Sequence, residues 1–365
     1  MNDMTGTRCI DITDESRKET LNNKGEDRRI TVRFYYPGIE EEGKNKTEVL
    51  TEGKLKGFGK ISDRTLYDQR VKLYDGLGIK GGPYPLVLFS HGYGCFAEQN
   101  SDLCSFLAEH GYIVASISHT YEASETVFED GTVVLYDKSL TWKSFKPLIP
   151  AIIDLLRVSF MKRKSPEEAL DIFDRHQLRY ESFMTERVNE WAKDSSLTIR
   201  KIREMNDDPE SFLYQRIDLS KGVGATGHSF GGAAAYALCL YEDEISCGVN
   251  MDGGLFGDFG EDVNHKPFLQ ILNKGNYNVV TRSILYHDAP VHFMIFKDMK
   301  HIGFTDFKFL TRKKSMVGTS DPVKTMDTIN EVHLAFFDRY LKQGEKDDKT
   351  PLPVNMEALE SYDIY

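Results

Sequence analysis

Short apolar runs alternate with helical patterns along most of the chain. The runs at 85–90 and 112–118 are continuous, which is typical of strands buried on both faces of a parallel sheet. A helical pattern at 98–109 separates them, so this stretch predicts a strand, a helix and a second strand. Further apolar runs predict three more strands, at 246–251, 267–272 and 290–296. The alternation predicts an α/β fold with a mostly parallel central sheet and helices on both faces.

The N-terminal part of the chain follows other patterns. Residues 1–28 are polar and charged, and they predict a loosely held N-terminal arm. Residues 29–37 alternate and end in a proline, which predicts a strand. Residues 38–80 mix charge runs with short apolar pieces and predict an irregular excursion with one short helix near 67–74.

The middle of the chain interrupts the alternation with a predicted helical insertion at 139–207. Its first part, 144–161, is strongly apolar, and helical patterns follow at 168–191 and 195–205. We interpret the insertion as part cap and part outer helix layer. Near the end of the chain, helical patterns occur at 278–286 and, with a clear amphipathic character, at 325–343.

The stretch 222–236 carries the strongest chemical signal. It predicts a short strand, a glycine-rich turn around Ser229 and a helix that opens on small residues. Gly227-His-Ser-Phe-Gly231 fits G-x-S-x-G, the nucleophile elbow of α/β-hydrolases, in which a strained turn exposes the serine. Glycines two positions before and after the serine remove the Cβ atoms that would collide in such a turn. A chain of this length contains the pentapeptide by chance about one time in ten, so an ordinary glycine-rich turn is the alternative.

A serine nucleophile needs a base, and position relative to the strands selects one histidine. In this fold the base follows the acid, and functional groups lie at the carboxyl edge of the sheet. Only His301 follows the carboxyl end of the last predicted strand. The other downstream histidines precede a strand, lie inside one or lie in the final helix: His265, His287, His292 and His333.

The same rule narrows the choice of acid, which has to orient the base. No carboxylate occurs at 266–287, so the strand at 267–272, whose end commonly carries the acid in this fold, has none. Asp252 ends the preceding strand beside two glycines, and it is the favoured acid. Asp298, in the same turn as His301, is the competing candidate. The remaining carboxylates lie on the wrong edge or in the loop after Asp252: Glu242, Asp243, Glu244, Asp258, Glu261, Asp262 and Asp288.

Acyl transfer also needs donors for the negative charge that develops on the carbonyl oxygen. One donor in this fold is the backbone N–H after the nucleophile, which is Phe230 here. The second comes from the loop after an early strand. That loop is His91-Gly-Tyr-Gly94, and Tyr93 is the candidate because the flanking glycines allow a close approach to the substrate.

Size and charge exclude some classes of protein. At 365 residues and 41.7 kDa, we expect one domain over residues 1–365. The net charge of −11 argues against a nucleic-acid partner. Because the N-terminus lacks the pattern of a secretory signal and the five cysteines form no C-x-x-C pair, we expect a cytoplasmic protein without a metal or cofactor.

Four blocks of residues together resemble the plasma-type platelet-activating factor acetylhydrolases. They are Phe89-Ser-His-Gly-Tyr-Gly-Cys-Phe96, His110-Gly-Tyr-Ile-Val-Ala115, Gly227-His-Ser-Phe-Gly-Gly-Ala233 and His301-Ile-Gly-Phe-Thr-Asp-Phe307. The resemblance covers roughly residues 30–345. It implies an α/β-hydrolase fold, an acid at Asp252, oxyanion donors at Tyr93 and Phe230, and hydrolysis of short or oxidised acyl esters, phospholipids among them, without a metal.

Two alternatives stay open. A general carboxylesterase or a lipase would use the apolar segment 145–160, beside the basic Lys162-Arg-Lys164, as a lid or a membrane contact; a helix packed on the sheet is the simpler interpretation. A binding protein that retains the fold without catalysis would lack a member of the triad. The oligomeric state is not predicted.

Overall fold

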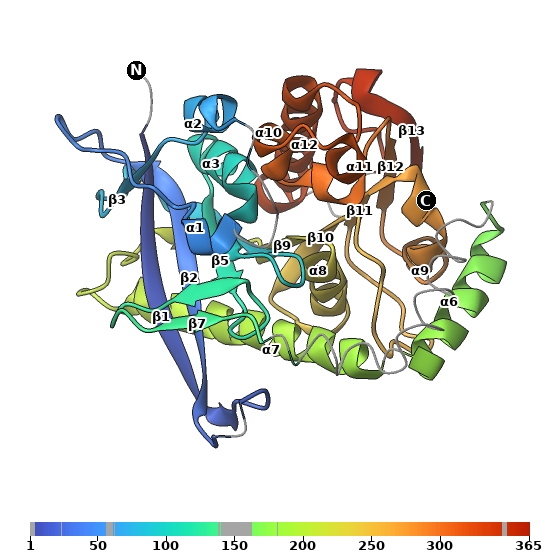
Figure 1. The fold of residues 1–365 in the computed structure, drawn as a ribbon, viewed down its shortest axis with the longest axis horizontal. Helices are drawn as coiled ribbons and strands as arrows, with labels where there is room; N and C mark the ends of the chain where they lie inside the picture. The colour runs from blue at the N-terminus through green and yellow to red at the C-terminus, as the bar shows by residue number, and fades with distance from the viewer. Residues whose placement is uncertain are drawn as a thin grey trace.

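The computed structural model describes residues 4–22, 24–55, 61, 63–137, 139, 163–180, 182–344 and 349–365. In this part of the chain one sheet of eleven strands runs through the molecule, in the order β13-β12-β11-β10-β9-β4-β5-β2-β1-β3, with β8 paired to β4 (Figure 1). The strands are β1 (Met4–Lys18), β2 (Asp27–Gly38), β3 (Leu73–Asp75), β4 (Tyr84–Ser90), β5 (Ile113–Ser118), β8 (Ile217–Asp218), β9 (Val223–His228), β10 (Ile245–Met251), β11 (Phe268–Asn273), β12 (Val291–Phe296) and β13 (Leu359–Ile364).

The centre of the sheet is parallel, as predicted. Neighbouring strands from β5 through β4, β9, β10 and β11 to β12 all run in the same direction. Antiparallel pairs flank this parallel centre on both sides, with β2 against β5, β1 against β2 and β13 against β12, and the short β3 lies parallel to β1 at one edge. Because the central strands share a direction, their carboxyl ends meet at one edge, where the predicted site residues lie.

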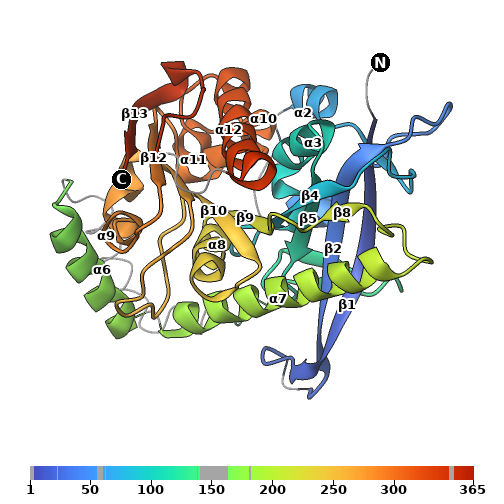
Figure 2. The ribbon, with the colours of Figure 1, turned by 180° about the vertical axis from the view of Figure 1, so that it is seen from behind.

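Helices cover both faces of the sheet, as expected for strands that are apolar on both sides. Helix α8 and the long helix α7 pack on one face with α6, and α3, α10 and α12 pack on the other (Figures 1 and 2). The helices are α1 (Glu52–Leu55), α2 (Thr65–Arg70), α3 (Ser101–Glu109), α6 (Pro166–Tyr180), α7 (Ser182–Asp207), α8 (Phe230–Tyr241), α9 (Arg282–Leu285), α10 (Phe307–Leu310), α11 (Lys314–Val317) and α12 (Pro322–Phe337).

The predicted N-terminal arm is wrong for most of residues 1–28. Met4–Lys18 forms β1 and pairs with β2 over its length. Two of the charged residues after it, Glu19 and Arg28, are buried, because Arg28, on β2, donates to Asp194 of α7 at 2.7 Å and to Glu19 at 2.6 Å. In the sequence alone, a polar segment whose charges are paired inside the protein has the same composition as a solvated arm.

Other boundaries differ in smaller ways. The irregular stretch 38–80 contains α2 and the short strand β3, and the expected helix at 278–286 is a 3₁₀ turn followed by α9. Helix α7 is continuous where two helices met in the prediction. The hairpin of β6 (Glu125–Val127) and β7 (Val133–Leu135) and the edge strand β13 were not predicted. The apolar part at 144–161 lies outside the described residues, among which no helix is long and apolar enough to cross a membrane.

Candidate active site

Ser229 lies at the sharp turn between β9 and α8. Its φ of 55° and ψ of −119° are strained for a residue with a side chain. The flanking glycines are required by space. A Cβ on Gly227 would lie 2.3 Å from the backbone of Gly231, and one on Gly231 would lie 2.1 Å from the carbonyl oxygen of Ser90. The sequence therefore folds here as the motif predicts, with the serine at the start of a helix.

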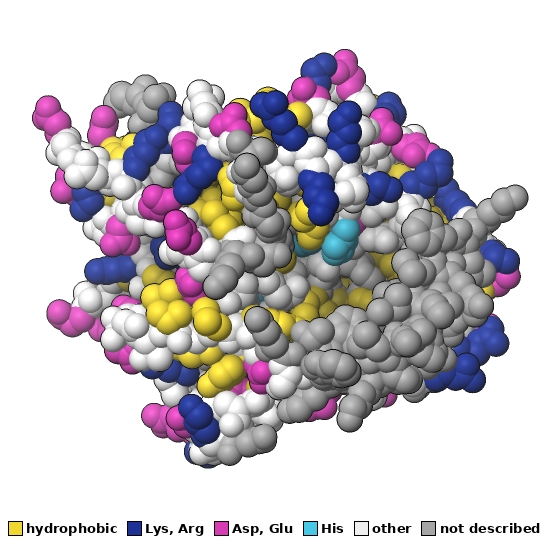
Figure 3. All heavy atoms as spheres, viewed as in Figure 1, with side chains coloured by type: hydrophobic (Ala, Val, Ile, Leu, Met, Phe, Trp, Pro, Cys, Tyr) yellow, Lys and Arg dark blue, Asp and Glu magenta, His cyan; other side chains and the backbone are white. Residues whose placement is uncertain are grey.

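Hydrogen bonds join the three residues that the sequence selected. His301 Nε2 lies 2.8 Å from Ser229 Oγ, and His301 Nδ1 lies 2.7 Å from Asp252 Oδ2. Asp252 is fully buried at the end of β10, whereas the His301 side chain is 41% exposed after β12. On the face drawn in Figure 3, a histidine side chain reaches the surface close to a basic side chain. The arrangement suits a proton transfer from Ser229 to His301, with Asp252 holding the imidazole in place.

Asn273 completes the surroundings of Asp252, and the sequence reasoning missed it. Its backbone N–H donates to Asp252 Oδ1 at 2.7 Å, and its side-chain amide donates to Oδ1 at 2.8 Å and to Oδ2 at 2.7 Å. Asn273 ends β11, the strand whose end was expected to carry no acid. An amide side chain at the end of β11 could have indicated a hydrogen-bond donor to an acid at the end of the neighbouring strand β10.

Asp298, the competing acid, lies elsewhere. Its side chain is exposed, and its backbone carbonyl accepts hydrogen bonds from the amides of Thr319 and Ser320 at 2.8 and 3.3 Å. In the described part of the chain, the carboxylate bonded to His301 is that of Asp252.

The loop after β4 lies directly against Ser229, the predicted nucleophile. A Cβ on Gly92 would lie only 3.3 Å from Ser229 Cβ, so the glycine permits this approach. The amide of Gly92 donates to Gln99 Oε1 at 2.9 Å, and that of Gly94 donates to the carbonyl of Glu122 at 2.8 Å. These contacts hold the loop in one conformation beside Ser229.

His91 orients the peptide group between Gly92 and Tyr93. Burial lowers the pKa of His91 to about 3, so its ring is neutral. Nε2 accepts from the amide of His119 at 3.2 Å, which leaves Nδ1–H to donate to the Gly92 carbonyl at 2.7 Å. The amide of Cys95 donates to the same carbonyl. Because C=O and N–H of a trans peptide point in opposite directions, the Tyr93 N–H points away from His91.

The two predicted oxyanion donors come from residues in contact. The ring centroids of Tyr93 and Phe230 lie 5.3 Å apart, and the ring centroid of Trp191, on α7, lies 6.3 Å from that of Tyr93 and 4.8 Å from that of Phe230. The indole N–H of Trp191 donates to Glu122 at 2.9 Å, the residue whose carbonyl holds Gly94. Helix α7 thus supports the loop, which the sequence did not indicate.

A buried charge network anchors this part of α7. Arg187 donates twice to Glu122, at 2.9 and 2.6 Å, and Asp194 bonds to both Arg28 and His119. Burial would raise the pKa of Asp194, but the charge of Arg28 and the bond to His119 outweigh it and hold the pKa well below its usual range. Asp194 is therefore ionised, and the network ties α7 to β2 and to the loop at 119–122.

His228, the residue before Ser229, supports His301, the predicted base. Burial, reinforced by the nearby His301, lowers the pKa of His228 well below its usual range, so the ring is neutral. Its Nε2–H donates to the backbone carbonyl of His301 at 2.9 Å, and the two rings lie 4.7 Å apart. The elbow therefore holds His301 through its backbone carbonyl as well as through the hydrogen bond to Ser229.

Comparisons with known proteins identify a matching family and several relatives of the chain. The family model for platelet-activating factor acetylhydrolase, isoform II, matches residues 18–355. The platelet-activating factor acetylhydrolase of Cavia porcellus is 30% identical over 276 residues, which cover 72% of this chain and 58% of that protein. The one from Bos taurus is 26% identical over 313 residues, which cover 79% and 63%. The chain thus spans less than two thirds of the length of these relatives.

A solved structure resembles the whole chain. A ferulic acid esterase from Streptomyces cinnamoneus matches with a TM-score of 0.69 and 19% identity, covering 99% of this chain and 97% of that one. At this identity the likeness concerns the fold, and the chain has the α/β-hydrolase fold that the sequence predicted. Among the described residues, no group of three or more His, Cys, Asp or Glu side chains could hold a metal ion.

Proposed function

The chain belongs to the platelet-activating factor acetylhydrolase isoform II family, and from this premise we propose that it is a serine esterase. The observation that carries the proposal is the continuous hydrogen-bonded line from Ser229 through His301 to Asp252. Nucleophile, base and acid come from the ends of three different segments, and their side chains meet at the carboxyl edge of the sheet.

In the proposed first half of the reaction, Ser229 Oγ attacks the ester carbonyl. His301 Nε2 takes the hydroxyl proton, and Asp252 stabilises the resulting imidazolium through Nδ1–H. The carbonyl oxygen becomes an oxyanion, for which the N–H groups of Tyr93 and Phe230 are the proposed donors. When the intermediate collapses, the bond to the alcohol breaks and His301 returns the proton to the departing alkoxide.

The second half repeats the same steps with water. His301 removes a proton from the water as its oxygen attacks the acyl-serine, and a second oxyanion forms at the same donors. Collapse breaks the bond between Ser229 and the acyl group, and His301 returns the proton to the serine. The acid product leaves, and no cofactor enters the scheme.

The proposed substrates are short or oxidised acyl esters, including phospholipids with an acetyl group at the sn-2 position. Family membership supports this choice, and the name of the relatives describes the same chemistry. A probable 1-alkyl-2-acetylglycerophosphocholine esterase from Arthroderma benhamiae is also 42% identical over 53 residues, which cover 13% of this chain and 14% of that protein. We also propose that the reaction needs no metal, that the protein has no nucleic-acid partner and that the chain forms a single functional domain.

An assay with p-nitrophenyl esters from acetyl to palmitoyl tests the proposal. The wild type should prefer the shortest chains, and Ser229→Ala should lower kcat about a million-fold, because triad members act as a unit. Ser220→Ala, at an exposed serine, is the matched control and should behave as wild type. A preference for long chains would favour a lipase, and a wild type without turnover would favour a binding protein.

A further inference from the structure

Two loops of the proposed esterase site follow strands that are far apart in the sheet. The loop with Tyr93 follows β4, and the segment with His301 follows β12. Three strands, β9, β10 and β11, lie between them. At about 4.8 Å per strand, β4 and β12 are roughly 19 Å apart. Because both loops extend beyond the strand ends, the sheet alone does not fix their positions relative to each other.

Two buried amide side chains join these loops. Gln99 and Asn100 end the 3₁₀ turn η2 (Ala97–Asn100) and are 1% and 0% exposed. Gln99 Oε1 accepts from the backbone N–H of Gly92 at 2.9 Å, and Gln99 Nε2 donates to Asn100 Oδ1 at 2.8 Å. Asn100 Nδ2 donates to the carbonyl of Phe304 at 2.8 Å. We call this line of three hydrogen bonds the amide relay.

The backbone at each end sets the direction of the amide relay. The Gly92 N–H can only donate, so Gln99 presents its oxygen there. The Phe304 carbonyl can only accept, so Asn100 presents its NH₂ group there. The remaining NH₂ group of Gln99 and the remaining oxygen of Asn100 then face each other as donor and acceptor. If either amide turned over, like groups would face each other in a buried site, which is costly.

The amide relay ends close to two parts of the proposed machinery. At one end it holds the residue before Tyr93, the proposed oxyanion donor. At the other end it holds the last residue of the 3₁₀ turn η4 (His301–Phe304), which begins at the proposed base. The backbone N–H of Asp306 also donates to the Gln99 carbonyl at 2.9 Å and joins the same two segments. In an enzyme site, a misplacement of about 1 Å can lower the rate about 100-fold.

The geometry points to Gln99 and Asn100 as positioning residues, which hold the oxyanion loop and the His301 segment in one arrangement. They act through backbone groups of the two loops rather than on the reacting atoms. The inference rests on the proposed esterase function, and it adds two residues on which the rate of that reaction depends.

Steady-state kinetics of Gln99→Met with p-nitrophenyl acetate test the amide relay. Methionine keeps the length of the side chain and removes both hydrogen bonds, so kcat and kcat/KM should fall together about 10- to 100-fold, while KM changes less than about threefold. A merely structural role would lower the Tm without this loss of kcat. A kcat within about threefold of the wild type would overturn the inference.

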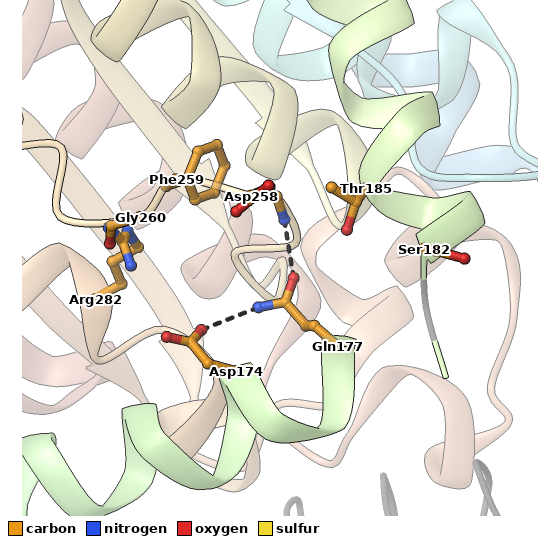
Figure 4. Close-up of a pocket in the computed structure, with 9 residues that line it drawn as sticks. Asp174, Gln177, Ser182, Thr185, Asp258, Phe259, Gly260 and Arg282 are labelled. Carbon is orange, nitrogen blue, oxygen red and sulfur yellow. Dashed lines mark hydrogen bonds between the residues drawn. The ribbon is translucent and has the colours of Figure 1, made fainter. Parts of the chain in front are cut away.

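Gln177→Met is the matched control. Gln177, drawn in Figure 4 with its two hydrogen bonds, is also buried; its oxygen accepts from the Gly257 N–H at 2.9 Å, and its NH₂ group donates to Asp174 at 3.3 Å. The Tm of both variants should fall, but only Gln99→Met should lose kcat. An equal loss of kcat in the control would show a general effect of removing a buried amide and would overturn the inference.

A double variant tests whether the two amides act as one line. Asn100→Leu should lower kcat by about the same factor as Gln99→Met, and the double variant should lose little more than either, because a broken line is not broken again. Losses that multiply would contradict the relay. Asn264→Leu is the control, since Asn264 is buried and its Nδ2 donates to the Lys266 carbonyl at 2.9 Å, before β11 at the other edge of the sheet.

The outcomes separate the amide relay from the function on which it rests. A wild type without turnover would refute the esterase proposal and the relay with it. An active wild type together with an unimpaired Gln99→Met would refute the relay alone. If Asn100→Leu does not fold, the comparison of Gln99→Met with Gln177→Met still decides.

Discussion

Replacing Asp252 with asparagine tests which carboxylate orients the proposed base. In the wild type, Asp252 Oδ1 accepts from the backbone N–H of Asn273, and Oδ2 accepts from His301 Nδ1–H. An asparagine has one oxygen and one NH₂ group to replace these two acceptors. Because the Asn273 backbone can only donate, the oxygen should face it, and the NH₂ group should face His301.

That orientation would place the imidazole in the wrong tautomer. Facing a donor, His301 Nδ1 would have to accept, so that Nε2 carries the proton and cannot take one from Ser229. The same change at the acid of a serine-protease triad lowers kcat about 10⁴-fold. At 1.36 kcal/mol per tenfold, this corresponds to about 5 kcal/mol of transition-state stabilisation. We expect a loss of this order in Asp252→Asn.

Asp298→Asn is the matched control. The Asp298 side chain is exposed, and the backbone carbonyl of this residue accepts two hydrogen bonds, which the substitution leaves in place. Its φ of 52° is one that asparagine tolerates. We expect kcat for p-nitrophenyl acetate to change less than about threefold in this variant. A loss in Asp298→Asn equal to or larger than that in Asp252→Asn would refute the reasoning.

Three further substitutions test other parts of the structure. Asn273→Ala removes two side-chain hydrogen bonds to the Asp252 carboxylate and should lower kcat about 10- to 100-fold, as steady-state kinetics would measure; an unchanged kcat would make Asn273 a bystander. Gly231→Ala places a Cβ 2.1 Å from the Ser90 carbonyl and should destabilise the fold by about 1–3 kcal/mol or more, so a Tm equal to that of the wild type would contradict the tight elbow. Burial lowers the pKa of His333 to about 4, below its unfolded value near 6.5, so the unfolded state binds the additional proton and stability falls as the pH drops through this window. Denaturant unfolding at pH 7 and pH 5 should show that His333→Gln loses about 2 kcal/mol less than the wild type over this interval, and equal losses would contradict the assignment.

The central strands and the elbow could be predicted because each depends on local sequence. A strand buried on both faces must be apolar throughout, and a strand that turns at once into a helix needs small residues around the hinge. The family match over residues 18–355 confirms the resemblance that four short blocks suggested. The residues chosen from strand order, Ser229, His301 and Asp252, lie within hydrogen-bond distance of one another, while their catalytic roles stay a prediction.

The features that were missed depend on contacts between distant segments. β1 is polar in sequence, and it is held in the sheet by pairing with β2 and by Arg17, whose partners Glu190 and Asp194 lie on α7 more than 160 residues later. Asn273 donates a hydrogen bond to Asp252, which lies 21 residues before it. Trp191, in the predicted insertion, contacts Tyr93 in the loop after β4. The hydrophobic periodicity of a segment cannot predict these contacts, because the position of each residue depends on a partner in a distant segment.

Labelling with a fluorophosphonate, followed by peptide mapping, tests the central claim most directly. The reagent forms a covalent bond only with an activated serine, so it reports the nucleophile and its base together without a known substrate. We expect one adduct on Ser229 in the wild type, none in Ser229→Ala and much slower labelling in Asp252→Asn. An adduct on another residue, or undiminished labelling of Ser229→Ala, would contradict the proposed serine esterase.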